Sequence, residues 1–203
     1  MDTQNHWEKV YTEKGPTAVS WYRPHLETSL SLIERVASKQ SAIIDVGGGE
    51  STLVDDLLSH AYENITVLDV SQTAVSETKK RLGGASERVH WVVAEITKAE
   101  LPKSGYDVWH DRAVFHFLTQ QSDRVAYVRQ AAHAVKSGGH VIVSTFGPEG
   151  PTKCSGLDVV RYDADSLHRE FGVHFRLLES MKELHQTPFG TIQQFVYCHC
   201  KIE

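Results

Sequence analysis

The chain contains little cysteine and no long apolar run. Three cysteines among 203 residues, an odd number, argue against a disulfide framework. No stretch approaches the roughly 18 consecutive apolar residues of a membrane span. The first 20 residues carry charges where a signal peptide would have its apolar core. We therefore expect free thiols, no membrane partner and a cytoplasmic location.

Clustered positive charge is also lacking. The net charge is −5, and the basic run Lys79-Lys80-Arg81 falls on an expected helix, where such a run is typical of a solvated face. This disfavours a nucleic-acid partner. A hydrophobic content of 40% and the lack of a linker-like change in composition favour one domain over residues 1–203.

The most informative segment is Ala42-Ile-Ile-Asp-Val-Gly-Gly-Gly-Glu-Ser51. An apolar, β-branched run ends in an acid and three glycines, after which a helix is expected to begin near Thr52. Glycines let a ligand approach the main chain, and the first N–H groups of a helix point at it. The segment therefore predicts a nucleotide-type binding turn.

An acid at the end of the next apolar run supports this interpretation. Asp69 follows Ile65-Thr-Val-Leu and lies 22 residues after Gly47, at the offset where an acid holds the hydroxyls of a ribose. A dinucleotide fingerprint, G-x-G-x-x-G, would need glycine at position 52, which is Thr52 here. A nicotinamide enzyme is thus the less favoured of two cofactor classes.

The other class is indicated by the acid two residues before the first glycine. Asp45-Val46-Gly47-Gly48-Gly49 resembles the acid-x-G-x-G-x-G pattern of class I S-adenosylmethionine-dependent methyltransferases, with Ser51 in place of the third glycine. The resemblance covers nearly the whole chain and implies S-adenosylmethionine as the cofactor. It implies a cofactor site of Asp45, Gly47, Gly48, Gly49, Asp69, Val70, Glu95, Ile96, Asp111 and Trp21.

Strand-like and helix-like patterns alternate along the chain. A first helix is expected at about 25–38. The expected strands cover 42–46, 65–69, 89–94, 106–110 and 140–146, with helices at about 52–61, 72–82, 122–136 and 165–171. Such alternation requires a parallel sheet with crossover helices.

The last part of the chain changes character. Residues 175–183 and 192–202 read as two strands joined by a turn that contains Thr187-Pro-Phe-Gly190, which predicts an antiparallel hairpin. We expect an α/β, doubly wound, mostly parallel seven-stranded sheet of the methyltransferase kind, with an antiparallel last strand. A dehydrogenase of Rossmann type would not usually end this way.

The segment His110 to Leu118 follows the expected fourth strand, where the resemblance places the loop that faces the sulfonium and the acceptor. Asp111 and His116 are candidate catalytic residues there, and Arg112 and His116 are candidate substrate contacts. Two plainer interpretations stay open: an Asp111–Arg112 ion pair, and a core histidine between Phe115 and Phe117.

Aromatic residues gather ahead of the first expected strand. Trp7, Tyr11, Trp21 and Tyr22 fall in residues 1–24, and Trp7 to Tyr11 resembles the Trp-x-x-x-Tyr entry of several small methyltransferases. The rings are either ordinary core or a helical lid over a cationic sulfonium. As a lid, Tyr11 would join the catalytic residues, while Tyr22 and Arg23 would contact the substrate.

The cysteines suggest a metal site only superficially. Cys198 and Cys200 alternate with Val196 and Ile202 on one face of the last strand, as small core residues do, and lie far from the cofactor end. No metal is therefore predicted. Cys154, in the loop after the fifth strand, is a candidate substrate neighbour, as is His185.

The sequence predicts methyl transfer to a small molecule, because a short chain without an added substrate domain favours a small acceptor. We expect a small thiol or sulfide, which ionises with modest assistance. The alternative is a protein lysine methyltransferase, since residues 183–198 are similar to a segment of small seven-strand lysine methyltransferases. A non-catalytic cofactor-binding scaffold is a third interpretation.

Overall fold

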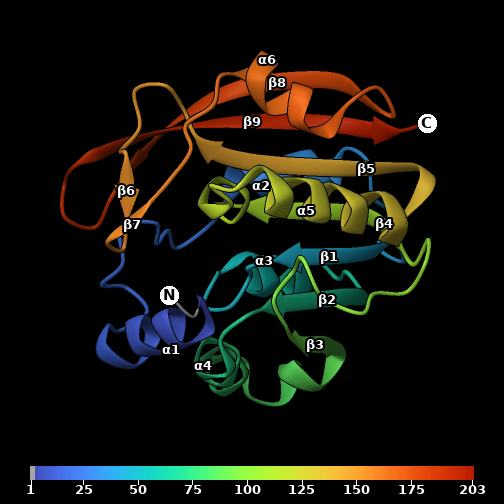
Figure 1. Ribbon diagram of the computed structural model, residues 1–203. Helices are drawn as coiled ribbons and strands as arrows, with labels where there is room; N and C mark the ends of the chain where they lie inside the picture. The colour runs from blue at the N-terminus through green and yellow to red at the C-terminus, as the bar shows by residue number, and fades with distance from the viewer. Residues whose placement is uncertain (1–2) are drawn as a thin grey trace.

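A computed structural model describes residues 3–203. Its main sheet has seven strands in the order β3-β2-β1-β4-β5-β9-β8 (Figure 1). The strands are β1 (Ala42–Val46), β2 (Asn64–Asp69), β3 (Val89–Val93), β4 (Tyr106–Arg112), β5 (Val135–Phe146), β8 (Phe175–Gln186) and β9 (Ile192–Ile202). Strands β1 to β5 are parallel, and β9 is antiparallel to both of its neighbours. The predicted fold, with its antiparallel last strand, is confirmed.

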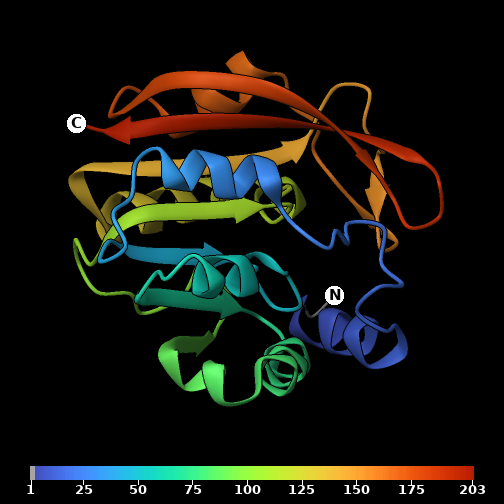
Figure 2. The same ribbon diagram turned by 180° about the vertical axis from the view of Figure 1, so that it is seen from behind.

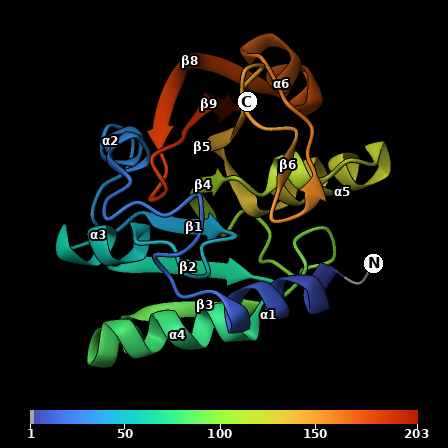
Figure 3. The same cartoon turned by 90° about the vertical axis from the view of Figure 1, so that its left-hand side faces the viewer.

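Helices cover both faces of this sheet. They are α2 (Glu27–Glu34), α3 (Leu53–Ser59) and α4 (Gln72–Leu82) on one face and α5 (Gln121–Ala134) and α6 (Ala164–Phe171) on the other (Figures 2 and 3). Short 3₁₀ turns, η1 (Gly83–Arg88) and η2 (Phe115–Phe117), precede β3 and α5. With a helix layer on each side, β1 is buried at every position and its sequence is correspondingly β-branched and apolar.

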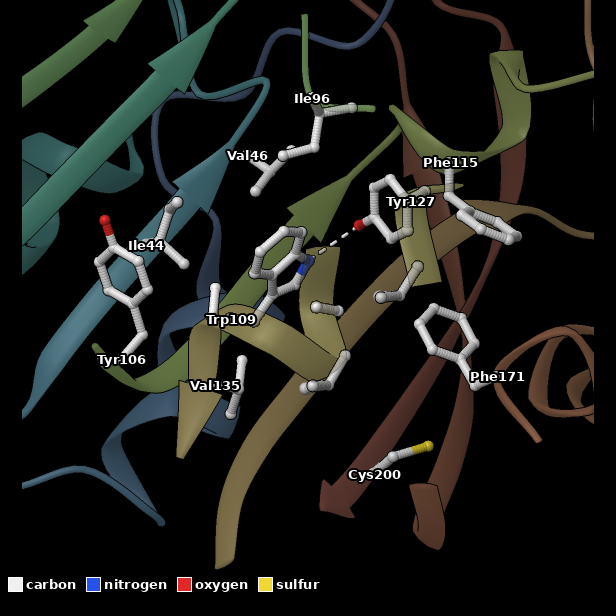
Figure 4. Packing of buried hydrophobic residues seen from close by; sticks show 14 of the residues in the cluster. Ile44, Val46, Ile96, Tyr106, Trp109, Phe115, Tyr127, Val135, Phe171 and Cys200 are labelled. Carbon is white, nitrogen blue, oxygen red and sulfur yellow. Dashed lines mark hydrogen bonds between the residues drawn. The ribbon is translucent and has the colours of Figure 1, made fainter. Parts of the chain in front are cut away.

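The core on the α5 side is built around aromatic rings. Trp109 of β4 donates its indole N–H to the hydroxyl of Tyr127 over 2.9 Å, and both side chains are fully buried (Figure 4). Phe115 and Phe171 pack against the Tyr127 ring. These contacts fix the end of β4, from which the loop that borders the site departs.

Two helix boundaries differ from the prediction. Helix α2 ends at Glu34 rather than near residue 38, because Val36 hydrogen-bonds to Ile33 in a tighter turn. Helix α5 ends at Ala134, since Val135 is extended and pairs with Tyr106 of β4. Gly138 and Gly139, which follow the expected helix, lie inside β5.

The carboxyl ends of the parallel strands are covered by segments outside the main sheet. Helix α1 (Thr3–Glu13) lies beside α4 at this end, and the small hairpin of β6 (Lys153–Cys154) and β7 (Leu157–Asp158) lies above it (Figure 3). Among residues 3–203, no helix has both the length and the apolar character needed to cross a membrane.

Candidate functional site

The glycine turn after β1 is tightly enclosed. Gly47 has φ +70°, a conformation that favours glycine, and a Cβ there would overlap the side chain of Val114. A Cβ on Gly48 would press on the carboxylate of Asp45 and on Val67. Because these two glycines have no side chain, Val114 of the loop after β4 can pack against Gly47, and the Asp45 carboxylate can lie against Gly48.

Asp69 joins this turn to the start of α4. Its carboxylate accepts the N–H of Gly49 at 3.0 Å and the N–H of Ser71 at 2.8 Å. Ser71 in turn caps α4, because its hydroxyl accepts the N–H of Ala74. Burial raises the pKa of Asp69 to about 6, against the lowering effect of these hydrogen bonds. Asp69 is held in one orientation with its carboxylate on the wall of a cavity.

That first cavity has a volume of about 120 Å³ and lies at the carboxyl end of the sheet. At one end its wall carries the acid and apolar residues predicted for an adenosine site, namely Asp69, Val70, Glu95 and Ile96. The other part is lined by Trp7, Tyr11, Trp21, Arg112, Phe117 and Cys154, which we call the acceptor wall. The cavity thus brings together most of the predicted cofactor residues and two of the six predicted substrate residues, Arg112 and Cys154.

Rings from three segments build the acceptor wall. The Trp7 ring of α1 lies 5.1 Å from Phe117 and 5.9 Å from Trp21, both edge-on. Tyr11 lies 6.5 Å from Trp21 in the same manner. The aromatic residues are therefore a lid and a packed cluster at once, so the two interpretations of the amino-terminal rings are not exclusive.

Glu8 fastens this lid to the sheet domain. Its carboxylate accepts the N–H groups of Gln72 at 2.6 Å and Thr73 at 3.1 Å, and the hydroxyl of Ser71 at 3.0 Å. An acid at the amino terminus of α4 also meets the positive end of the helix dipole. Burial would raise the pKa of Glu8, but the hydrogen bonds lower it below its usual value. We call this contact the Glu8 latch.

A second, smaller cavity of about 40 Å³ adjoins the first and shares Tyr11, Trp21, Gly47 and Arg112 with it. Its wall also carries Tyr22, Arg23, Asp45, Gly48, Glu50 and His110. The predicted residues Asp45 and Gly48 thus lie here, whereas Gly49 is not among the described residues that line either cavity. Gly49 contributes through its hydrogen bond to Asp69.

A chain of buried polar groups runs from this second cavity into the sheet. Asp45 Oδ1 lies 2.7 Å from His110 Nδ1, and His110 Nε2 lies 2.9 Å from the hydroxyl of Ser29. The Ser29 hydroxyl lies 3.2 Å from that of Tyr197, which accepts Arg112 Nε–H at 3.2 Å. This series of contacts fixes the Oδ1 atom of Asp45. The other carboxylate oxygen, Oδ2, is buried with no hydrogen-bond partner among residues 3–203.

Arg112 takes its acidic partner from the last hairpin. Its guanidinium lies 3.3 Å from the Glu183 carboxylate, which Arg23 also approaches at 3.4 Å. Burial would raise the pKa of Glu183, but the nearby guanidinium of Arg112 holds it below its usual value. Arg23 also pairs with the exposed carboxylate of Glu27 at 3.3 Å, so Arg112 and Glu183 are the more buried members of this group of charges.

Asp111 is not among the described residues that line either cavity. It is fully buried and accepts the N–H groups of Val114 and Phe115 and the hydroxyl of Tyr127. Burial raises its pKa to about 6. Adjacent residues of a strand point to opposite faces, so an Asp111–Arg112 ion pair does not form. Asp111 shapes the loop after β4, and the prediction that it contacts the cofactor does not agree with its position.

The two predicted histidines are also buried beside the site rather than in it. His116 Nδ1 accepts the N–H of Phe146, and its ring lies 4.5 Å from Phe117. Burial lowers the pKa of His116 to about 3, so it is neutral at physiological pH. His185 is bound to the carbonyl of Ser20. Neither is among the described cavity-lining residues, because the rings of Phe117 and Phe195 pack against them.

The cysteines divide as the strand pattern predicted. Cys198 and Cys200 are buried core residues on the α5 side of the sheet. Cys154 lines the first cavity, and burial raises the pKa of its thiol to about 11.

Sequence comparison places this site within a known group. Residues 43–139 match a family model described as a methyltransferase domain. The chain is 25% identical over 138 residues to a mouse eEF1A lysine and N-terminal methyltransferase, and the match spans 68% of the chain but only 20% of that longer relative. It is 22% identical over 199 residues to human EEF1A lysine methyltransferase 2, covering 89% of the chain and 77% of the relative.

Structural comparison agrees. A SAM-dependent methyltransferase from Anabaena variabilis superposes with a TM-score of 0.78 at 14% identity, over 100% of this chain and 96% of the other. Residues 43–139 thus form a methyltransferase domain, and the chain has the fold of the class I S-adenosylmethionine-dependent methyltransferases. S-adenosylmethionine is accordingly the cofactor of this methyltransferase.

The residues present fit that cofactor. Asp69 is held at the cavity wall where the ribose hydroxyls are expected, with Val70 and Ile96 for the adenine. The unpartnered Asp45 Oδ2 and the bare backbone at Gly47 and Gly48 suit the methionine portion, which carries both an ammonium and a carboxylate group.

Sequence reasoning missed several residues of the site. No role was assigned to Glu50 from the sequence, although the residue is buried and lines the second cavity. His110, Ser29 and Glu183 were missed because their partners lie 65 or more residues away. An acid within the glycine turn was the one signal that could have drawn attention to Glu50.

Proposed function

We propose that this methyltransferase transfers the methyl group of S-adenosylmethionine to a small thiol or to sulfide. The observation that carries the proposal is the chemistry of the acceptor wall, which is largely aromatic and carries no proton acceptor. Its ionisable side chains are Tyr11, Arg112 and Cys154. Burial raises the pKa of Tyr11 well above its usual value, the pKa of Cys154 is about 11, and the guanidinium is a cation.

A site of this kind suits an acceptor that ionises by itself. A free thiol has a pKa near 8.5, whereas an alkyl ammonium has one near 10.4 and must lose a proton before it has a lone pair. Arg112 would stabilise the thiolate, because it lines both cavities and shares Glu183 with Arg23. The acceptor wall would therefore raise the thiolate fraction without a general base.

When bound, S-adenosylmethionine supplies a methyl group on a positively charged sulfur. Asp69 would hold the ribose hydroxyls, and Asp45 with the backbone at Gly47 would hold the methionine end. The rings of Tyr11 and Trp21 would face the sulfonium, since aromatic faces attract cations. Trp7 and Phe117 would exclude water and limit the acceptor to a small molecule held in line with the methyl group.

A second candidate is a protein lysine methyltransferase. It is favoured by the two relatives described above, whose names give lysine in eEF1A as their target. The two candidates differ in what the acceptor wall must admit, a small anion or a long ammonium side chain.

A screen of acceptors decides between them. Purified protein is incubated with S-adenosylmethionine and, separately, with sulfide, small thiols and a panel of lysine peptides, and S-adenosylhomocysteine is quantified. We expect turnover with sulfide or a thiol. Turnover of a lysine peptide without turnover of any thiol would establish the second candidate. Binding of S-adenosylmethionine without any turnover would support a non-catalytic scaffold. We further propose a cytoplasmic location, in keeping with three unpaired thiols.

A further inference from the structure

Glu50 carries a buried carboxylate for which the site described above gives no use. Its side chain is 6% exposed, and neither carboxylate oxygen has a hydrogen-bond partner among residues 3–203. A buried charge without a partner is costly, so such a group is usually paired or coordinated. Glu50 lines the second cavity, so its carboxylate is placed to meet whatever ligand enters there.

The cation that acts on the Glu50 carboxylate is already engaged elsewhere. Arg81 of α4 donates to the backbone carbonyl of Glu50 at 3.1 Å and pairs with the carboxylate of Asp55 at 2.7 Å. It lowers the pKa of Glu50 by its charge, but it makes no hydrogen bond to the Glu50 carboxylate. The chain therefore provides a counter-charge at a distance and leaves both oxygens free.

The second cavity separates its charges. Glu50 and the free Oδ2 of Asp45 lie on the glycine-turn part of the wall. Arg23 and Arg112 lie on the part formed with β4 and the segment before α2, where Glu183 contacts both guanidiniums and Glu27 contacts that of Arg23. A ligand with an ammonium and a carboxylate on one carbon matches this distribution, because each of its charges would face groups of opposite sign.

We propose that Glu50 is an ammonium-binding residue of the second cavity, and that its ligand is the α-ammonium group of the cofactor's methionine portion. The proposal rests on S-adenosylmethionine as the cofactor. It adds a second acid to Asp45, and it makes Glu50 a residue that distinguishes ligands with an amino-acid portion from ligands without one.

The charge of Glu50 should depend on pH in the physiological range. Burial raises its pKa to about 7, with Glu77 and Asp69 raising it further and Arg81 opposing them. Tyr11 of the lid faces the same groups and stays neutral, since its own pKa lies well above the usual value. An arriving ammonium group favours the ionised carboxylate, so binding of such a ligand should release a proton near pH 7.

The test compares two ligands in two variants by calorimetry. S-adenosylhomocysteine carries the amino-acid portion, and 5′-methylthioadenosine lacks it. Glu50→Gln keeps the shape of the side chain and removes the charge, whereas Glu77→Gln removes an exposed acid of α4 that acts on Glu50 only through space. We expect Glu50→Gln to weaken the binding of S-adenosylhomocysteine by about tenfold or more, while the affinity for 5′-methylthioadenosine changes by less than about threefold. Glu77→Gln should leave the affinity for each ligand within about threefold of that of the parent.

A pH series provides the second readout. Affinity of the parent for S-adenosylhomocysteine should rise between pH 6 and pH 8, and Glu50→Gln should flatten that rise, while Glu50→Asp should keep it. The pKa of Asp69, about 6, affects the parent and the variant alike, so their difference isolates Glu50.

Several results would overturn the inference. Unchanged S-adenosylhomocysteine binding by folded Glu50→Gln would show that Glu50 does not meet the ammonium group. An equal loss of affinity for both ligands would show that Glu50 supports the glycine turn instead. If the parent bound neither ligand, the cofactor assignment itself would fail, and this inference with it.

Discussion

Replacing Glu8 by alanine tests whether the lid is held by a single carboxylate. The variant removes three hydrogen bonds to the start of α4, from the N–H groups of Gln72 and Thr73 and the hydroxyl of Ser71. A lost amino-terminal cap costs about 0.5–2 kcal/mol, and a lost charge at a helix terminus costs about 0.3–1 kcal/mol at a solvated site. Because Glu8 is only partly buried, we take about 1–2 kcal/mol for docking of the lid.

The expected result is a less firmly docked α1 on an otherwise intact protein. At about 1.4 kcal/mol per factor of ten, the docked fraction should fall by about five- to thirtyfold relative to the undocked one. Amide hydrogen exchange over residues 3–13 should quicken by a similar factor. S-adenosylhomocysteine should bind more weakly by up to the same factor, because Trp7 and Tyr11 of the lid line the first cavity.

Glu13→Ala is the matched control. Glu13 lies on the same helix and pairs with Lys9 in solvent, where an ion pair contributes little. Exchange and affinity in Glu13→Ala should match the parent. If Glu8→Ala also matched the parent in both measurements, the Glu8 latch would not hold the lid, and aromatic packing alone would.

The latch should also weaken in acid. The pKa of Glu8 is lowered in the folded protein, so its stabilisation is present above the ordinary value of about 4.5 and is lost as the pH falls through the lowered value. Hydrogen exchange of α1 in the parent should approach that of Glu8→Ala as the pH falls from 4.5 through the lowered pKa. A difference between the two that does not change at all as the pH is lowered would contradict a stabilising role for the ionised carboxylate.

Three further outcomes follow from contacts at the site and in the core. Asp69→Ala should weaken S-adenosylhomocysteine at least about tenfold in calorimetry, since charged hydrogen bonds contribute about 1.5–3 kcal/mol each; an unchanged Kd would limit Asp69 to its bonds with Gly49 and Ser71. Tyr127→Phe should lower the free energy of unfolding in urea by about 1–3 kcal/mol, because it leaves the buried Trp109 N–H without an acceptor and removes one of the donors to Asp111; a loss below about 0.5 kcal/mol would contradict this. Arg112→Met should slow thiol methylation most near pH 7 and least near pH 9, where the thiolate forms unaided; a pH-independent loss would assign Arg112 to packing alone.

Local signals made the fold and half of the site predictable. Each of these signals lies within a short stretch of sequence: the glycine turn, Asp69 at the end of a strand, and Ser71 at the start of a helix. Their spacing predicted the strands and the residues expected to bind the cofactor. The antiparallel β9 was likewise predictable, because the short turn at 187–190 leaves a hairpin as the simple solution.

Burial is what the sequence could not reveal. His116 reads as a candidate base by its residue type, but the rings of Phe117 and Phe146 enclose it and remove its charge. In the sequence, Glu50 looks like an ordinary acid near the start of a helix. In the structure it is buried, and it lines the second cavity together with Tyr11 of the lid. Both outcomes depend on segments far away in the chain, which no local pattern encodes.

The position of β9 has a consequence for how the chain is made. Strand β9 is last in sequence, yet it lies inside the sheet, between β5 and β8. Until residues 192–202 have been synthesised, β5 has an unpaired edge from His140 to Phe146, and β8 has no strand to join. Closing the sheet requires contacts between distant segments, which makes folding slow and leaves that edge open to pairing with other chains. The nascent protein is therefore exposed to such pairing until β9 emerges.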